Sequence, residues 1–298
     1  MKIATYLLVC LSVSFIQAQQ RYESPVFEST NKKTFAYTEE LSLDVYQPEG
    51  DTENNRIALL LVHGGGFSGG QRDGNLESNF MKKMALRGYV GVSMSYRLLR
   101  KGKGFGCDCP AVEKETTFLE AAKDVYAATE YLKAHAEQLG INPEKIVLIG
   151  SSAGAEAVLN AAFMQQSPTY ASALGDETVA YAGLVSFAGA VLDADLIIQD
   201  NAIPSLLFHG KKDKLVPFGS APHHYCDSSD PGHIVLDGSR TISRKIRQQK
   251  VASQLVKDPK GNHDWANLPY KKTDLIASFI FRTLVNKQAV KKRIRIKN

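Results

Sequence analysis

Gly150-Ser151-Ser152-Ala153-Gly154 follows directly after the apolar run Ile146-Val147-Leu148-Ile149. This combination predicts a buried strand, a tight turn at Ser152 and a helix that starts at Ala153. The residues two before and two after the serine must be small, because such a turn brings two backbone segments together. Gly150 and Gly154 meet that need. The turn would present the Ser152 hydroxyl above a sheet, beside the positive end of the helix dipole.

A second apolar run, residues 57–62, leads straight into His63-Gly64-Gly65-Gly66-Phe67. Three consecutive glycines leave backbone amides uncovered by side chains, so the amides of Gly65 and Gly66 can point at a single oxyanion. The N–H of Ala153 would add a third donor. The two motifs together therefore predict a serine nucleophile, Ser152, with an oxyanion hole.

The other two members of a catalytic triad follow in a defined order. Asp213 lies just past a third apolar run, residues 204–208, and His263 follows a strand candidate at residues 251–256. The chain order Ser152, Asp213, His263 is the order found in α/β-hydrolases and differs from the two serine protease orders. We therefore expect His263 to be the general base and Asp213 to orient it.

Several residues near these motifs have competing interpretations. Asp193 and Asp195 follow the preceding strand and are alternatives to Asp213 as the acid. His209 is close to Asp213 at a strand end, where we expect it to make a structural hydrogen bond. Phe67 and Trp265 each adjoin a catalytic motif, so both are candidates for substrate contact, and a core position is the alternative for Trp265.

These motifs resemble those of α/β-hydrolases of the esterase/lipase branch with an HGGG oxyanion motif, and in particular bacterial feruloyl and acetyl-xylan esterases. The resemblance also includes Tyr96-Arg97-Leu98 and spans residues 41 to 281. It implies an α/β-hydrolase fold and an esterase that forms an acyl-enzyme without metal or organic cofactor. The implied substrates are small esters or polysaccharides that carry acetyl or hydroxycinnamoyl groups. The alternatives are a general small-acyl carboxylesterase or lipase, and a catalytically inactive hydrolase-fold binding protein.

Strand and helix patterns alternate along the chain. They predict an α/β fold with a mostly parallel central sheet flanked by helices on both faces, and the motif loops lie at the carboxyl ends of its strands. Two long irregular stretches, residues 98–114 and 219–240, are expected to form the pocket walls. Further strands are expected at residues 42–45, 89–95 and 182–187, and helices at residues 80–88, 118–139 and 275–284.

Length and charge limit the other classes of function. The 298 residues, 44% of them hydrophobic, suffice for one catalytic domain, residues 19–298, with a basic tail from about residue 288. Residues 1–18 have the pattern of a secretory signal peptide, which predicts a secreted or periplasmic protein without stable membrane insertion. The net charge is +5, and residues 291–297 contain five positive charges, so the remainder is near neutral and no nucleic-acid partner is expected.

Removal of the signal peptide would leave Cys107, Cys109 and Cys226. An odd number of cysteines allows at most one internal disulfide, and we expect Cys226 to pair with Cys107 or Cys109 across two loops at the active-site edge. A zinc site that adds His223 and His224 is an alternative, but the spacing matches no common structural zinc pattern. No metal site is therefore expected.

Overall fold

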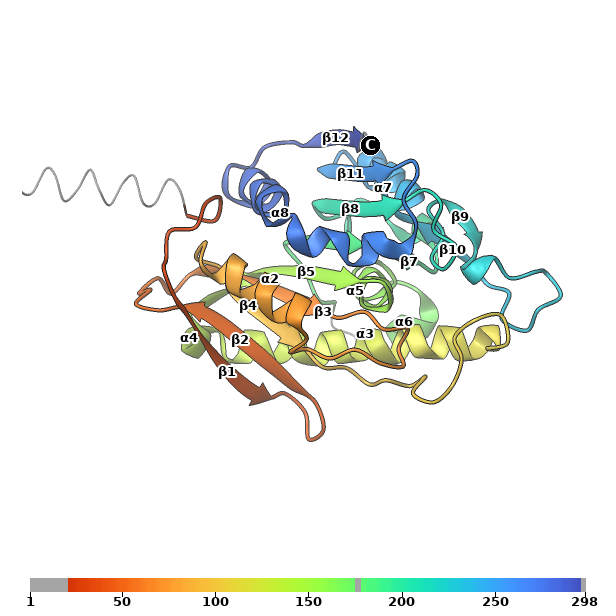
Figure 1. The fold of residues 1–298 in the computed structure, drawn as a ribbon, viewed down its shortest axis with the longest axis horizontal. Coiled ribbons are helices and arrows are strands. Elements are labelled where there is room, and N and C mark those ends of the chain that lie inside the picture. The colour runs from red at the N-terminus through yellow and green to blue at the C-terminus, as the bar shows by residue number, and fades with distance from the viewer. Residues whose placement is uncertain (1–20, 175–177, 296–298) are drawn as a thin grey trace, which may run out of the picture.

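The computed structural model describes residues 21–174 and 178–295 and is built around a nine-stranded sheet (Figure 1). The spatial order of its strands is β1-β2-β4-β3-β5-β6-β8-β11-β12. β1 and β2 are antiparallel to their neighbours, and every pair from β4 to β12 is parallel. The strands are β1 (Thr30–Ala36), β2 (Ser42–Pro48), β3 (Arg56–Val62), β4 (Val90–Met94), β5 (Ile141–Ser151), β6 (Gly183–Phe187), β8 (Ser205–Gly210), β11 (Ser253–Asp258) and β12 (Lys291–Arg295).

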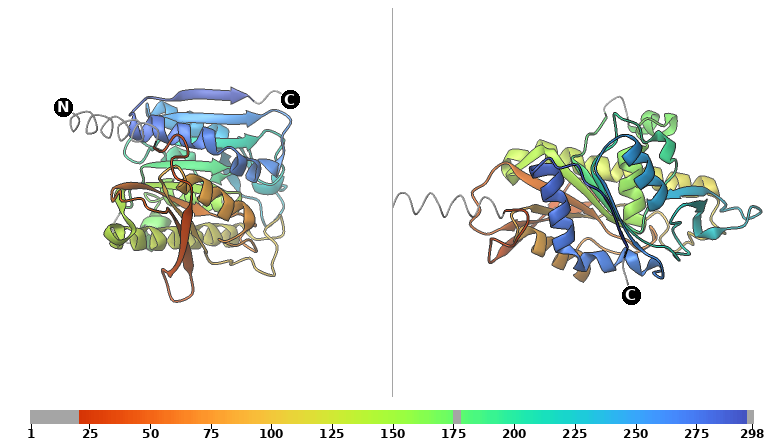
Figure 2. Two further views of the ribbon diagram at one scale, coloured as in Figure 1. Left: turned by 60° about the vertical axis from the view of Figure 1, so that its left-hand side comes forward. Right: turned by 90° about the horizontal axis from the view of Figure 1, so that it is seen from above.

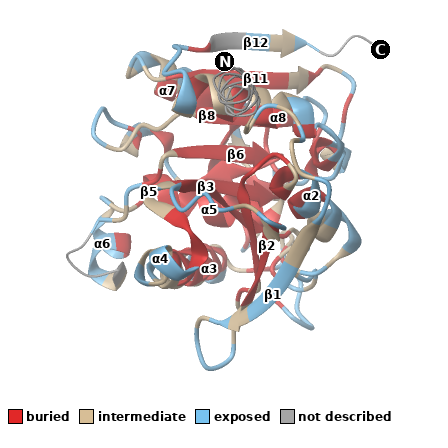
Figure 3. Ribbon diagram, turned by 90° about the vertical axis from the view of Figure 1, so that its left-hand side faces the viewer, coloured by how far each residue is buried: buried red, intermediate tan, exposed pale blue. Residues whose placement is uncertain are grey.

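β3 shows why the central strands are continuous apolar runs. All seven of its residues are buried, and successive side chains enter opposite faces of the sheet. Leu60 and Val62 belong to one hydrophobic cluster, whereas Leu59 and Leu61 belong to the other. A parallel strand covered by helices on both faces needs apolar residues at every position. Figure 3 shows the contrast with the largely accessible edge strand β1.

The helices cover both faces of this sheet (Figure 2). α3, α5 and α7 contribute to the cluster that contains Leu60, whereas α2 and α8 contribute to the cluster that contains Leu59. The predicted arrangement, a mostly parallel sheet with helices on both faces, is therefore confirmed. The helices are α2 (Asn75–Ala85), α3 (Ala111–Ala134), α4 (Ala136–Leu139), α5 (Ala153–Phe163), α6 (Pro168–Leu174), α7 (Ser239–Gln248) and α8 (Thr273–Ile280).

Two stretches differ in detail from the sequence expectation. The helix predicted over residues 118–139 begins earlier, at Ala111, and is interrupted at His135, which separates α3 from α4. The stretch 219–240, expected to be irregular, contains β9 (Ser220–Pro222) and β10 (Val235–Gly238) and leads into α7. These strands form a small antiparallel sheet with β7 (Ala190–Val191), in the order β7-β10-β9.

Part of the basic tail belongs to the sheet. Residues 291–295 form β12, which pairs in parallel with β11 from Ser253 to Lys257. Arg293 and Arg295 are exposed, whereas Ile294 is partly buried against the sheet. The expected signal peptide, residues 1–18, lies outside the described residues. None of the helices in the described ranges combines the length and hydropathy needed to cross a bilayer.

Candidate active site

Ser152 lies on the sharp turn between β5 and α5, with φ 50° and ψ −122°. This left-handed conformation is unusual for a residue with a side chain, and the surrounding backbone holds it there. A Cβ atom on Gly150 would lie 2.3 Å from the carbonyl oxygen of Gly154, and one on Gly154 would lie 2.2 Å from that of Val62. Glycine is therefore required on both sides of the turn, as the sequence pattern predicted.

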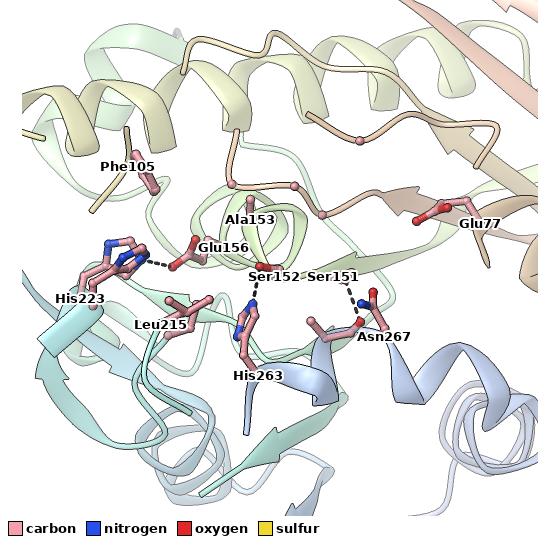
Figure 4. Close-up of a pocket in the computed structure, with 17 residues that line it drawn as sticks. Glu77, Phe105, Ser151, Ser152, Ala153, Glu156, Leu215, His223, His263 and Asn267 are labelled. Atoms are coloured by element: carbon pink, nitrogen blue, oxygen red, sulfur yellow. Dashed lines mark hydrogen bonds and ion pairs between the residues drawn. The ribbon is translucent and has the colours of Figure 1, made fainter. Parts of the chain in front are cut away.

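Three side chains from separate loops form a hydrogen-bonded relay, and Figure 4 shows its contact between Ser152 and His263. The Oγ atom of Ser152 lies 2.8 Å from Nε2 of His263, and Nδ1 of His263 lies 2.7 Å from Oδ2 of Asp213. Asp213 follows β8, and His263 follows β11. The structure thus brings together the three residues predicted to be catalytic, in the geometry that a nucleophile, a base and an orienting acid require.

The environment of Asp213 keeps its carboxylate ionised. Burial alone would raise the pKa of Asp213, but hydrogen bonds from His209 and His263 lower it well below its usual range. The other carboxylate oxygen, Oδ1, accepts hydrogen bonds from the backbone amides of Leu215 and Val216 at 2.9 and 3.0 Å. An ionised acid at this position stabilises the imidazolium that forms when His263 accepts a proton.

His209 has the structural role expected of it. Its Nδ1 atom lies 2.8 Å from the hydroxyl of Ser239, and its Nε2 atom lies 3.1 Å from the carbonyl of Val216 and 3.4 Å from Oδ2 of Asp213. The alternative acids lie elsewhere. Asp193 accepts a hydrogen bond from the backbone amide of Asp195, whose own carboxylate pairs with a lysine. The geometry therefore leaves Asp213 as the acid.

The glycine loop after β3 runs against the nucleophile. A Cβ atom on Gly64 would lie 3.3 Å from Cβ of Ser152, and Gly65 and Gly66 have φ values of 118° and 61°. The three glycines line a cavity together with Ser152 and Ala153. The N–H of Ala153 is the first of α5 and has no acceptor within the helix. The residues whose amides are predicted to hold an oxyanion thus line the same cavity as Ser152.

His63 supports this loop and is not in a position to act as a base. Its Nδ1 atom lies 2.8 Å from the carbonyl of Gly64, and its own carbonyl accepts a hydrogen bond from the hydroxyl of Tyr96 at 3.0 Å. Burial lowers the pKa of His63, so the ring is neutral near pH 7. A neutral ring next to the glycine loop fixes the loop without adding charge to the site.

Both aromatic candidates for substrate contact are core residues and neither lines the cavity at Ser152, so the prediction is wrong for Phe67, and the core alternative holds for Trp265. Phe67 is fully buried, and its ring meets those of Phe105 and Phe118 edge-on. Trp265 is 3% exposed, donates a hydrogen bond from Nε1 to Asp258 at 3.1 Å and stacks on Phe208. A residue adjacent in sequence to a catalytic motif need not face the active site, because neighbouring positions on a turn point in different directions.

A cavity of about 470 Å³ opens at Ser152 and extends to both sides of it (Figure 4). One side is lined by Glu77 and Asn267, and the other by Phe105, Glu156 and His223. Small residues predominate around the nucleophile, and several of the side chains that reach the cavity are polar. The complete lining is Gly64, Gly65, Gly66, Gly70, Glu77, Phe105, Ser151, Ser152, Ala153, Glu156, Leu215, Val216, His223, His224, His263, Ala266 and Asn267.

Glu156 is the residue in this cavity that sequence reasoning missed. It lies on α5 four residues after Ser152 and is 2% exposed. Positions i and i+4 of a helix share a face, so this spacing could have placed the carboxyl beside the nucleophile. Burial raises the pKa of Glu156 to about 8. His223 and His224, beside Glu156, could be found only from the structure, because their segment approaches α5 through tertiary contacts.

A disulfide fastens the walls of this cavity. Cys226 is bonded to Cys107, whereas Cys109 is a buried free thiol. The pairing is one of the two that were expected, and it links the loop that carries Phe105 to the loop that carries His223. Because Cys107 and Cys226 are joined, their sulfurs cannot supply the thiolates of the alternative zinc site.

Comparisons with known proteins identify the family of the chain. The BD-FAE family model matches residues 43–191, half of the chain. Esterase-5B of Drosophila persimilis is 31% identical over 118 residues, which are 40% of this chain and 20% of that protein. Lipase 2 of Moraxella sp. (strain TA144) is 32% identical over 133 residues, 42% of this chain and 27% of that protein. The chain thus spans well under half the length of these two relatives.

Solved structures extend the comparison to nearly the whole fold. Esterase 2 of Thermogutta terrifontis, phosphorylated by paraoxon, superposes with a TM-score of 0.59 at 19% identity and covers 89% of this chain and 97% of its own. The butyrate-bound form of the same esterase has a TM-score of 0.59 at 18% identity and covers 91% and 98%. At this identity the likeness establishes the fold, which is that of the α/β-hydrolases. The chain belongs to the BD-FAE family.

Proposed function

We propose that this protein is a serine carboxylic ester hydrolase that acts through Ser152, His263 and Asp213. The observation that carries the proposal is the relay of 2.8 and 2.7 Å contacts, which ends at a serine in a cavity that the glycine loop also lines. Membership of the BD-FAE family and the matches to an esterase and a lipase support the same class of reaction.

The mechanism follows from the geometry. His263 accepts the proton of Ser152 as Oγ attacks the ester carbonyl, and Asp213 stabilises the imidazolium. The amides of Gly65, Gly66 and Ala153 receive the negative charge that develops on the carbonyl oxygen. His263 then protonates the departing alcohol, and a water molecule activated by His263 hydrolyses the acyl-enzyme.

The proposed substrates are polysaccharides that carry acetyl or hydroxycinnamoyl esters. The large apolar side chains that line the cavity are Phe105, Leu215 and Val216, and the remaining lining is small or polar. Such a lining suits a short acyl group attached to a polar alcohol better than a long aliphatic chain. Cleavage of simple small-acyl esters without a carbohydrate target is the alternative outcome of the test below.

The proposal includes export from the cell. Residues 1–18 have the pattern of a secretory signal peptide. The Cys107–Cys226 disulfide supports an oxidising compartment, because such bonds persist mainly in exported proteins. Detection of a mature chain that begins near residue 19 in the culture medium or periplasm of the producing cell would test this part directly.

The test of activity is release of p-nitrophenol from acetate, butyrate and octanoate esters by the wild type and by Ser152→Ala. We expect fast turnover of acetate, slower turnover of octanoate, and loss of turnover in the variant. Release of acetate from acetylated xylan would then identify a polysaccharide substrate. Turnover of the short esters but not of acetylated xylan would favour a general esterase. A folded wild type without turnover of any ester would favour the inactive, ligand-binding alternative.

A further inference from the structure

The cavity contains a second set of polar groups that the triad does not use. Oε1 of Glu156 lies 3.3 Å from Nε2 of His223 on one side of the cavity (Figure 4). Glu156 is 2% exposed and His223 is 1% exposed. Within the described residues, Nδ1 of His223 has no hydrogen-bond partner, and the contact of Glu156 Oε1 with Nε2 does not have the geometry of a hydrogen bond. A buried polar atom without a partner costs free energy, so such a pair beside a nucleophile indicates a ligand that completes it.

The charge state of these groups limits the kind of ligand. Burial raises the pKa of Glu156 to about 8 and lowers those of His223 and His224 to about 3 and about 4. The other titratable groups that act on Glu156 are His263, Asp213 and Lys114, and Lys114 Nζ donates to the carbonyl of Gly232 at 2.8 Å. Near pH 7 Glu156 and the two histidines are therefore mainly neutral, and each can both donate and accept a hydrogen bond.

We propose that Glu156 and His223 form a subsite that binds a hydroxyl group of the ester substrate and selects hydroxylated substrates. This inference rests on the proposed esterase function and names a substrate class for it. A hydroxyl both donates and accepts, so it can satisfy the neutral carboxyl and the neutral imidazole at once. An ammonium group would need an ionised carboxylate, and an aliphatic chain would offer neither buried group a hydrogen-bond partner.

The subsite is close enough to Ser152 to recognise a hydroxyl near the scissile bond. The backbone amide of Glu156 donates to the carbonyl of Ser152 at 2.9 Å, so the two residues are one helical turn apart on α5. Side chains at this spacing lie about 5–6 Å apart at Cβ. The bound hydroxyl would therefore be a few bonds from the ester, on either the acyl or the alcohol part of the substrate.

The segment that carries His223 is held in place independently of the ligand. The ring of His223 packs edge-on against Phe105 at 5.3 Å and against Phe118 at 6.0 Å. The backbone amide of His223 donates to the carbonyl of Ile234 at 2.8 Å. The disulfide at Cys226, three residues further on, joins this segment to the loop of Phe105. The imidazole is thus pre-positioned, as a specific hydrogen-bonding site requires.

Matched pairs of esters test the proposal. For the alcohol part, kcat/KM is measured on 2-hydroxyethyl acetate and propyl acetate by pH-stat titration at pH 6.5. For the acyl part, it is measured on p-nitrophenyl 3-hydroxybutyrate and p-nitrophenyl butyrate. Each pair is assayed with the wild type, with Glu156→Gln, which keeps a neutral donor and acceptor, and with Glu156→Leu. The ratio within a pair is independent of the amount of folded enzyme.

We expect the wild type to prefer the hydroxylated member of one pair by about tenfold or more, and the pair identifies the side of the substrate. Glu156→Gln should retain most of this preference, and Glu156→Leu should bring the ratio close to one. Turnover of the plain esters with ratios near one in the wild type would overturn the subsite and leave the esterase proposal intact. An unchanged preference in Glu156→Leu would also overturn it. Turnover of none of these esters by the folded wild type would overturn both proposals.

Discussion

Replacement of Glu156 by glutamine should change the pH dependence of stability in a defined window. The pKa of Glu156 is about 8 in the folded protein and 4.5 in its ordinary state. Between these values the folded protein retains a proton that the unfolded chain has lost, so the free energy of unfolding falls as pH rises towards 8. Glutamine has the same shape as the protonated acid and removes this dependence.

The window from pH 6.5 to pH 8 isolates this effect. The pKa values of His223 and His224 are lowered to about 3 and about 4. Between these values and the ordinary value of 6.5, the two histidines raise the free energy of unfolding as pH rises, which is opposite to the effect of Glu156. Above pH 6.5 both histidines are neutral in the folded protein and lose their remaining protons in the unfolded chain, a contribution that the wild type and the variant share. Between pH 6.5 and pH 8 the raised pKa of Glu156 lowers the free energy of unfolding by roughly 1.5 kcal/mol. This value allows for the partial loss of the proton near pH 8.

The assay is urea unfolding of the wild type and of Glu156→Gln at pH 6.5, 7.25 and 8.0. We expect the wild type to lose roughly 1.5 kcal/mol more than the variant between the first and last pH, with equal m-values. The direct comparison cancels every titrating group that the two proteins share. Parallel decreases in the two proteins would show that Glu156 is already ionised, and would refute the reasoning that makes the second polar site neutral.

Three further substitutions have outcomes that the structure predicts. Cys107→Ser opens a loop of 119 residues. It should lower the free energy of unfolding by about 3 kcal/mol and Tm by about 5 °C, measured by calorimetry. The pairing would be contradicted if a reductant lowered the Tm of this variant as much as that of the wild type. Asp213→Asn should lower kcat by about 10⁴-fold with little change in KM, and a loss below tenfold would exclude Asp213 as the acid. Phe67→Ala should cost about 3–5 kcal/mol in urea unfolding because Phe67 is fully buried, whereas a loss of less than about 1 kcal/mol would contradict its place in the core.

The sequence predicted the parts of the fold that depend on local backbone rules. Gly150 and Gly154 are required by contacts within about 2.3 Å of neighbouring backbone atoms, so the pattern around Ser152 specifies its turn. The apolar run of residues 57–62 in β3 specifies a strand buried on both faces. Asp213 and His263 follow apolar strands that end at the same edge of a parallel sheet, so their loops necessarily meet.

The features that were missed depend on contacts between distant segments. Residues 291–295 form an edge strand in which Ile294 packs against the sheet, whereas Arg293 and Arg295 remain exposed. Phe67 and Trp265 were candidates for substrate contact because of their neighbours in sequence, with a core position as the alternative for Trp265, and both rings lie in the core. The pairing of Glu156 with His223 joins α5 to a loop 67 residues away, and no local pattern contains it.

The claim that Ser152 is a nucleophile activated by His263 is tested most directly by covalent labelling with paraoxon, located by tandem mass spectrometry. We expect one diethylphosphoryl group per wild-type chain on Ser152, none on Ser152→Ala, and much slower labelling of His263→Ala. A phosphoryl group on Ser151 or on any other residue, or equal labelling of wild type and Ser152→Ala, would contradict it.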